Sequence, residues 1–325
     1  MIPAKLRTGD EVRVVSPAVS LGFIPEEQRT LARERFEALG LRVSFSSSVD
    51  VLDRFDSSPV GVRVSDLHEA FADPEVRGVF TTLGGYNSNQ LLDYLDYDLI
   101  GANPRILCGF SDITALATAI YTRTGLVTYS GPHFTTFGMK RGIEYTTEYL
   151  ERCLMREDPF DVPPADHWSD DPWYEDQEDR DLVPNPGYEV IHEGEVEGTL
   201  FGGNLGTLAL LFGTPYMPEL EGALLLIEED EEESAADFDR HLQSLIHQPG
   251  FSGVGGLVIG RFQRASEMDL DTLRAIIESK RELDRLPVVA NASFGHTTPP
   301  FTFPIGGLGT LRAENGRVEF RIDEH

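Results

Sequence analysis

The sequence predicts an α/β fold with a doubly wound, Rossmann-like parallel sheet in its first half. Strand and helix patterns alternate through that half, whereas the second half mixes the two kinds of element. Hydrophobic residues make up 40% of the 325 positions and aromatic residues 10%, which is typical of a folded globular protein. A chain of this length can form two domains with a substantial core.

The first half begins with a strand and then alternates. The segment "EVRVVSP" (11–17) has a strand pattern, residues 26–39 form an amphipathic helix that ends at Gly40, and "LRVSFS" (41–46) is the next strand. The patterns then predict a helix near 65–73, a strand in "GVFTTLGG" (78–85), a helical segment in "NQLLDYLD" (89–96) and a strand in "LVTYSGP" (126–132).

The stretch "RILCGFSDITALATAIY" (105–121) changes from a strand to a helix at Ser111. Apolar residues run through 106–110 and then recur at helical spacing through 113–120. Ligands of doubly wound sheets bind beyond the carboxyl ends of the strands. The loops 83–89 and 109–112 are therefore the first places to look for a site.

Residues 157–189 lose this periodicity and separate two expected domains. Residues 1–156 form the N-terminal α/β domain, and residues 190–325 form the C-terminal domain. The intervening linker or insert loop is rich in Pro and Asp and holds both tryptophans of the chain, Trp168 and Trp173. These rings either fold over a site or pin the loop to the body of the protein.

The second half contains buried strands, helices and a hairpin. The patterns predict a strand, a glycine turn and a helix in 194–215, a buried strand in 223–230, a helix at 235–248 capped by Ser234, a buried strand in 254–262, a strand leading into a glycine-histidine turn in 286–296, and a hairpin in 309–322 around Asn315 and Gly316.

Charge and cysteine content exclude several classes of function. The formal net charge of −28 makes nucleic acid and anionic membranes poor partners. Such acidity, with few lysines, fits either adaptation to high salt or an ordinary acidic enzyme. The chain shows no membrane span and no signal-peptide pattern, and its 2 cysteines do not make a disulfide framework. We therefore expect a cytoplasmic protein.

Two interpretations of Ser111 are open. Serine and aspartate are preferred helix caps, and spacing alone favours a cap. A strand-to-helix turn also exposes a nucleophile and aims helix N-terminal amides at developing negative charge. The segment Gly109–Ile113 has that shape but departs from the G-x-S-x-G pattern at Ile113.

A serine nucleophile needs a base and a group that orients the base. Among the eight histidines, His296 follows a buried strand directly at a glycine, and His133 follows the strand end "YSGPH". Glu228 follows the buried run "LLLI". Each of these residues also has an ordinary structural explanation, and spacing does not establish that Ser111, Glu228 and His296 meet.

Over nearly its whole length the chain resembles the LD-carboxypeptidase and microcin-immunity family of serine peptidases. The motifs that carry the resemblance occur in family order: "KLRTGDEVRVVSPA", "TTLGGYNSNQLL", "ILCGFSDITAL", "TYSGP", "FGGNLGTL", "LLLIEED" and "FGHTTPPFTFPIGG". The resemblance implies an N-terminal α/β domain, a smaller, β-rich α/β C-terminal domain, an active site between them and a homodimer.

The resemblance also assigns roles to residues. Ser111 matches the nucleophile, His296 the general base and Glu228 the residue that orients the imidazole, with the backbone N–H groups of Asp112 and Gly85 as the oxyanion hole. It implies an acyl-enzyme and neither a metal ion nor an organic cofactor. The residues expected to bind substrate are Gly84, Tyr86, Asn87, Trp168, Trp173 and Asn204.

Two branches of the family imply different substrates. One trims D-alanine from murein tetrapeptide, and the other resembles the microcin C immunity peptidase, which cleaves an aminoacyl or peptidyl group from a modified nucleotide. The stretch "GGYNSNQLL" and the insert "HWSDDPW" favour the second branch. A tryptophan stacked on a nucleobase contributes about 1–3 kcal/mol. The acidic run Glu229–Glu233 departs from what a nucleotide phosphate would favour.

We therefore expect a cytoplasmic serine peptidase, nearer the microcin-immunity branch, that hydrolyses a small amide. The alternatives are a murein tetrapeptide LD-carboxypeptidase and a non-catalytic protein that binds a small ligand.

Overall fold

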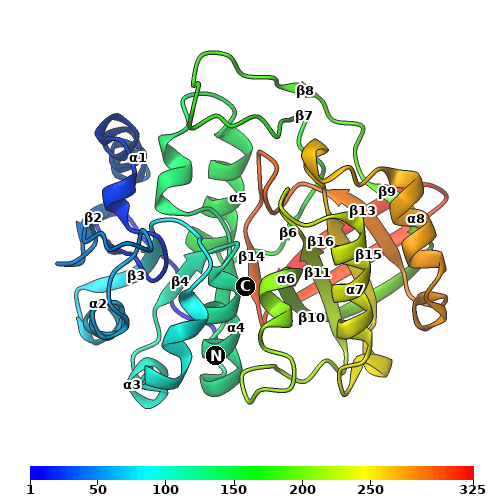
Figure 1. The fold of residues 1–325 in the computed structure, drawn as a ribbon, viewed down its shortest axis with the longest axis horizontal. Helices are drawn as coiled ribbons and strands as arrows, with labels where there is room; N and C mark the ends of the chain where they lie inside the picture. The colour runs from blue at the N-terminus through cyan, green and yellow to red at the C-terminus, as the bar shows by residue number, and fades with distance from the viewer.

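Two open β-sheets lie side by side in the computed structural model, which describes residues 1–325 (Figure 1). One sheet contains the first five strands of the chain, and the other contains most strands of the second half. A single cluster of 77 buried apolar residues runs through both sheets and the helices around them. The two sheets therefore share one continuous core.

The first sheet has the strand order β14-β5-β4-β3-β1-β2. Its first five strands in sequence pair in parallel, in the 2-1-3-4-5 order of a flavodoxin-like doubly wound sheet, and β14 adds an antiparallel edge. The predicted fold class is confirmed. The strands are β1 (Glu11–Val15), β2 (Arg42–Phe45), β3 (Val76–Thr81), β4 (Ile106–Gly109), β5 (Thr128–Ser130) and β14 (Phe303–Ile305).

Helices pack on both faces of this sheet (Figure 1). They are α1 (Glu26–Ala38), α2 (Val60–Ala72), α3 (Tyr97–Ala102), α4 (Ile113–Thr124) and α5 (Glu144–Met155), with short 3-10 helices η1 (Leu21–Phe23), η2 (Ser88–Tyr94) and η3 (Phe134–Gly138). Helix α2 begins five residues before the predicted start near 65. The reason is local, because Pro59 and Gly61 give the first turn the composition of a loop.

The second sheet has eight strands in the order β6-β16-β15-β10-β11-β12-β13-β9. Strands β10 to β13 run in parallel, and antiparallel strands complete both edges. Every residue of β11 and β12 is buried, as expected for strands covered on both faces. The strands are β6 (Phe160–Asp161), β9 (Glu189–His192), β10 (Gly194–Asn204), β11 (Ala223–Glu228), β12 (Gly256–Gly260), β13 (Val288–Ala292), β15 (Leu308–Glu314) and β16 (Arg317–Glu324).

The helices of the second half begin where side chains can cap them. Ser234 and Asp237 form a reciprocal capping box at the start of α7, so the predicted cap is confirmed. The predicted hairpin also forms, with Asn315 and Gly316 at φ 52° and 72° between β15 and β16. These helices are α6 (Leu205–Ala209), α7 (Ala235–Ile246) and α8 (Leu270–Glu278), with η4 (Phe251–Gly253), η5 (Arg264–Ser266) and η6 (Arg281–Leu283).

Some segments cross the domain boundaries that the sequence predicts. Strand β14, from the second half, pairs with β5 of the first sheet. The 157–189 insert contributes β6 to the second sheet and also forms the two-stranded sheet of β7 (His167–Trp168) and β8 (Val183–Pro184). Two-residue strands are too short to produce a periodic pattern. The division into domains stays a prediction.

No helix of the structure combines the length and the apolar character needed to cross a membrane.

The two sheets approach each other closely at Gly203. A Cβ atom on this residue would lie 2.4 Å from Thr114 Oγ1 in the first turn of α4, and its φ of +141° is one that side chains rarely adopt. Thr114 Oγ1 also accepts a hydrogen bond from the Asn204 N–H at 3.1 Å. Glycine at 203 therefore allows β10 to pack against the helix that follows Ser111.

Replacing Gly203 with a larger residue should push β10 away from α4. We expect Gly203→Ala to lower the free energy of unfolding by about 1–3 kcal/mol more than Gly213→Ala does, because the added methyl group is overpacked as well as strained. Gly213 is the matched control, since its φ is +74° and a Cβ atom added to it would have no neighbour within 4 Å. Urea denaturation measures both variants, and equal losses would contradict the steric explanation.

Candidate active site

Ser111 lies on a strained turn between β4 and α4. Its φ is +59°, one of few positive values among non-glycine residues in the chain. A Cβ atom on Gly109 would lie 2.3 Å from Thr81 Oγ1, so only glycine fits before the turn. Strain of this kind costs about 1–3 kcal/mol and is concentrated at functional sites. The turn has the geometry that exposes a nucleophile at the carboxyl edge of a sheet.

The Ser111 side chain does not cap the helix. Asp112 occupies the N-cap position of α4, and neither residue makes a side-chain capping hydrogen bond there. The Ser111 hydroxyl is instead bonded to His296, with 3.0 Å between Oγ and Nε2. The helix-cap interpretation that spacing alone favours is therefore not what the structure contains.

Ser111, His296 and Glu228 come together across the two sheets. His296 Nδ1 lies 2.7 Å from Glu228 Oε2, on the side of the imidazole opposite Ser111. The His296 backbone N–H donates to the same Glu228 oxygen at 3.3 Å. A hydroxyl, an imidazole and a carboxylate thus form one continuous chain of hydrogen bonds.

Two glycines make room for Glu228 at the end of β11. The residue is 2% exposed. A Cβ atom on Gly295 would lie 2.3 Å from Glu228 Oε2, and one on Gly260 would lie 2.7 Å from Glu228 Cβ. Because a buried carboxylate needs polar partners, its position against His296 is strongly constrained.

The pKa values of the two pocket histidines move in opposite directions. Burial opposes the charged form of His296, but the negative charge and hydrogen bond of Glu228 outweigh it and raise the pKa of His296. Burial lowers the pKa of His133 to about 3, and the nearby His296 contributes to this shift. His133 is therefore neutral at physiological pH, whereas Glu228 favours the protonated form of His296 and so raises its pKa.

The loop that follows β3 is held against the nucleophile turn by Asp112. Its carboxylate accepts hydrogen bonds from the N–H groups of Asn87 and Ser88 at 3.1 and 2.8 Å. Burial raises the pKa of Asp112, and these hydrogen bonds act against the rise. A Cβ atom on Gly84 would lie 2.9 Å from Ser111 Oγ. The loop therefore lies directly beside the Ser111 hydroxyl.

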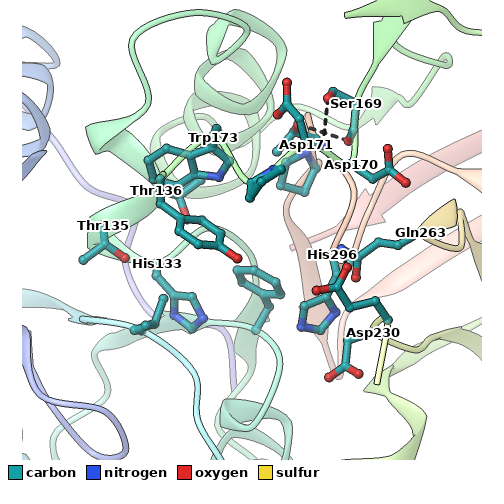
Figure 2. Close-up of a pocket in the computed structure, with 18 of the residues that line it drawn as sticks. His133, Thr135, Thr136, Ser169, Asp170, Asp171, Trp173, Asp230, Gln263 and His296 are labelled. Carbon is teal, nitrogen blue, oxygen red and sulfur yellow. Dashed lines mark hydrogen bonds between the residues drawn. The ribbon is translucent and has the colours of Figure 1, made fainter. Parts of the chain in front are cut away.

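A pocket of about 510 Å³ opens beside His296. Figure 2 shows His133 and His296 on facing sides of it, with Trp173 above and Asp230 below. Its walls come from the segments after β3, β4, β5, β11, β12 and β13 and from the 157–189 insert. The lining residues are Leu83, Phe110, His133, Thr135, Thr136, Ser169, Asp170, Asp171, Pro172, Trp173, Tyr174, Glu175, Asp230, Glu231, Glu232, Gln263, Gly295, His296, Thr298 and Pro300.

The two tryptophans of the insert have different surroundings. Trp173 lines the pocket and packs edge-on against Tyr174, with ring centroids 6.0 Å apart. The ring of Trp168 is instead covered by the guanidinium groups of Arg261 and Arg264, each 4.7 Å from its centroid. Trp168 does not line the pocket.

The remaining residues expected to bind substrate lie outside the pocket lining. Tyr86 is 63% exposed. Asn87 is buried, and its side-chain oxygen accepts a hydrogen bond from Arg63 at 3.0 Å. The Asn204 side chain caps α6 through the Thr207 N–H and donates to Glu229 at 3.3 Å.

Sequence reasoning missed several polar residues of the pocket. Thr135 and Thr136 follow the end of β5, and Gln263 follows the end of β12. The rule that ligands bind beyond strand ends would have found them. The same rule applies to Thr298, which follows the end of β13, but no such signal was available for Ser169 of the insert, which bonds to Thr298 through its backbone.

A second glutamate–histidine pair lies next to the first. Glu229 is 1% exposed and its Oε1 lies 3.0 Å from His241 Nδ1. Burial raises the pKa of Glu229 to about 7. His241 lies on α7 with its ring turned toward Glu229. No group of three or more His, Cys, Asp and Glu side chains is placed to hold a metal ion.

Profiles of both domains of a known family match the chain. Residues 12–131 match the LD-carboxypeptidase N-terminal domain, and residues 197–311 match the LD-carboxypeptidase C-terminal domain. The YocD protein of Bacillus subtilis, named as a candidate carboxypeptidase, is 53% identical over 100% of both chains. A murein tetrapeptide carboxypeptidase of Pseudomonas aeruginosa is 28% identical over 87% of this chain and 88% of its own.

Solved structures have the same fold. An MccF-like protein from Bacillus anthracis is 53% identical, with a TM-score of 0.99 over 100% of both chains. MccF in complex with glutamyl sulfamoyl guanosine is 27% identical, with a TM-score of 0.90 over 99% of this chain and 98% of the other.

The opposite pKa shifts of His296 and His133 can be measured directly. We expect the imidazole of His296 to titrate above its ordinary value of 6.5 and Glu228→Gln to lower that pKa, because the substitution removes the negative charge. His133 is the internal control and should remain neutral between pH 5 and 9. Nitrogen-15 NMR of the imidazoles follows both residues, and a His296 pKa that is unaffected by Glu228→Gln would contradict this electrostatic coupling.

Proposed function

Because the chain belongs to the LD-carboxypeptidase family of serine peptidases, we propose that it hydrolyses a small amide through Ser111, His296 and Glu228. Family membership makes the chain an enzyme of the serine carboxypeptidase type. This disfavours the alternative of a non-catalytic protein that binds a small ligand. The observation that carries the proposal is the hydrogen-bond chain from Ser111 Oγ through His296 to Glu228.

In the proposed mechanism His296 accepts and donates a proton once during acylation of Ser111 and once more during hydrolysis of the acyl-enzyme. Its Nε2 removes the proton from Ser111 Oγ as that oxygen bonds to the carbonyl carbon, and Glu228 stabilises the imidazolium through Nδ1–H. The imidazolium then donates the proton to the leaving nitrogen, which releases the amine and leaves an acyl group on Ser111. Water, activated by the same imidazole, hydrolyses the ester and regenerates the serine.

We assign the oxyanion hole to the backbone N–H groups of Asp112 and Gly85. Neither N–H donates a hydrogen bond within the protein. Asp112 follows the nucleophile at the start of α4, where helix amides favour negative charge. Gly85 has a φ of +144°, which favours glycine, and Gly84 beside it lets the loop reach Ser111.

For the substrate we propose an aminoacyl or peptidyl nucleotide of the microcin C type. The structure of MccF with glutamyl sulfamoyl guanosine supports this class, because that protein has the same fold. Trp173 lies in the pocket and is the better candidate to stack on a nucleobase. Arginine side chains already occupy the face of Trp168, so we assign that ring a role in positioning the insert.

The murein tetrapeptide is the second candidate substrate. The relative from P. aeruginosa favours it. A carboxypeptidase of that kind must bind the terminal carboxylate of its substrate, and a lysine or arginine side chain stabilises such a group. The pocket lining contains neither lysine nor arginine, and this disfavours murein relative to a substrate without a free carboxylate.

We further propose that the enzyme acts in the cytoplasm and as a homodimer. Both cysteines are free and buried, which is compatible with a reducing compartment. Light scattering of the purified protein measures the oligomeric state.

Removing either the nucleophile or the base should abolish hydrolysis of an aminoacyl sulfamoyl adenosine. We expect Ser111→Ala to lower kcat by ~10⁶, because the enzyme then lacks the atom that forms the acyl intermediate. His296→Gln should cause a loss of similar size. His241→Gln is the matched control, since His241 also pairs with a buried glutamate but does not contact Ser111. Retained activity in Ser111→Ala would refute the assignment.

The two substrate candidates give different products. We expect mass spectrometry to detect the free amino acid and sulfamoyl adenosine from the aminoacyl nucleotide, and no release of D-alanine from murein tetrapeptide. Release of D-alanine by the wild-type enzyme but not by Ser111→Ala would favour the murein role instead.

A further inference from the structure

The pocket beside the nucleophile has a wall of carboxylates. Asp230, Glu231 and Glu232 lie on the loop after β11, and Glu175 approaches from the insert. Burial, followed by the charges of Glu231 and Glu175, raises the pKa of Tyr174. The Tyr174 side chain is therefore close to carboxylates of both segments, the loop after β11 and the insert. The pocket is negatively charged on both of these sides. We call these four residues the wall carboxylates.

The wall carboxylates have no ion-pair partners, unlike the other acidic residues of the pocket. Asp170 is paired with Arg264 at 3.0 Å and Asp171 with Arg180 at 2.9 Å. Asp230 accepts a backbone N–H and Glu231 accepts an amide N–H from Gln263 at 3.3 Å. Those donors are neutral, so they leave the negative charge uncompensated.

No permanent cation faces the wall carboxylates. The lining contains neither lysine nor arginine, and its only basic side chains are His133 and His296. His133 is neutral at physiological pH because burial lowers its pKa to about 3. A cationic group of a ligand would therefore supply the missing positive charge.

His133 gives an independent indication of a ligand in this pocket. It is 1% exposed, and its Nδ1 lies 2.7 Å from Thr81 Oγ1. Its other ring nitrogen, Nε2, has no hydrogen-bond partner in the protein. Buried polar atoms normally have partners, so an unpaired ring nitrogen in the pocket lining is available to a polar group of a bound molecule.

We propose that the pocket selects substrates whose acyl group carries an ammonium or guanidinium, such as a lysyl or arginyl group, over substrates with an acidic acyl group. The wall carboxylates would attract the cation, and an acidic side chain would meet like charges. The acyl group preferred here would be positively charged, whereas the glutamyl group of the ligand in the MccF complex is negatively charged. The inference rests on the proposed amide hydrolysis and specifies the charge of the acyl group in the substrate.

The test compares three sulfamoyl adenosines that carry lysyl, glutaminyl or glutamyl groups. We expect kcat/KM for the lysyl compound to exceed that for the glutamyl compound by about 10-fold or more at low salt. Each wall carboxylate is partly screened by water and contributes modestly to the preference, and the four contributions act in the same direction. The neutral glutaminyl compound should fall between them. The ratio should decrease in 1 M NaCl, where exposed charges are screened.

The double variant Glu231→Gln/Glu232→Gln should reduce the lysyl-to-glutamyl ratio toward 1. Glu233→Gln is the matched control, because Glu233 lies on the same loop but does not line the pocket. The control variant should keep the wild-type ratio. Equal kcat/KM values for the three compounds, or a glutamyl preference, would overturn the inference and leave the proposed hydrolysis intact.

Binding separates the charge preference from catalysis. Calorimetry with the inactive Ser111→Ala variant measures Kd for the same compounds, and we expect the tightest binding for the lysyl compound. If wild-type enzyme hydrolyses none of them while Ser111→Ala still favours the lysyl compound, the charge preference stands and the proposed substrate class fails. Equal Kd values would overturn the charge preference.

Discussion

The candidate site depends on one buried carboxylate that must be paired. Glu228 is 2% exposed at the end of β11, and an unpaired charge at that depth would be strongly destabilising. His296 supplies both of its partners, a ring nitrogen and a backbone N–H. The same pairing directs the other ring nitrogen toward Ser111. Burial of Glu228 therefore fixes the geometry of the imidazole and raises its basicity in a single contact.

That contact requires two sheets to meet almost without intervening side chains. Glycine is needed where β10 meets α4, where the loop after β3 meets Ser111, and where the turn before His296 meets Glu228. At each point a Cβ atom would lie within 2.9 Å of a neighbouring atom. Gly203 lies between the two sheets, whereas the other two glycines let loops of the same sheet approach Ser111 and Glu228. Close backbone approach at Gly203 thus allows Asn204 of the second sheet to donate a hydrogen bond to Thr114 of α4.

Alternating strand and helix patterns predicted the α/β fold and most elements, and the strand ends made Ser111, Glu228 and His296 candidates. Their roles came from the resemblance to the family, because spacing alone favoured a helix cap at Ser111. The sequence could not establish that Ser111 and His296 converge, since they belong to different sheets and lie 185 residues apart. Trp168 could not be separated from Trp173 either, because its covering residues, Arg261 and Arg264, are remote in the chain. The short strands of the insert had no periodic signal.

Consecutive glutamates at the end of β11 have different surroundings. Glu228 is paired with His296, whereas Glu229 is paired with His241 and Asn204. Burial, aided by the adjacent charge of Glu228, raises the pKa of Glu229 to about 7, so it is partly protonated near neutral pH. The hydrogen bond to Glu229 raises the pKa of His241 in turn. Each of the two buried neighbouring carboxylates thus has its own histidine partner, while Asp230, Glu231 and Glu232 beyond them face the substrate pocket.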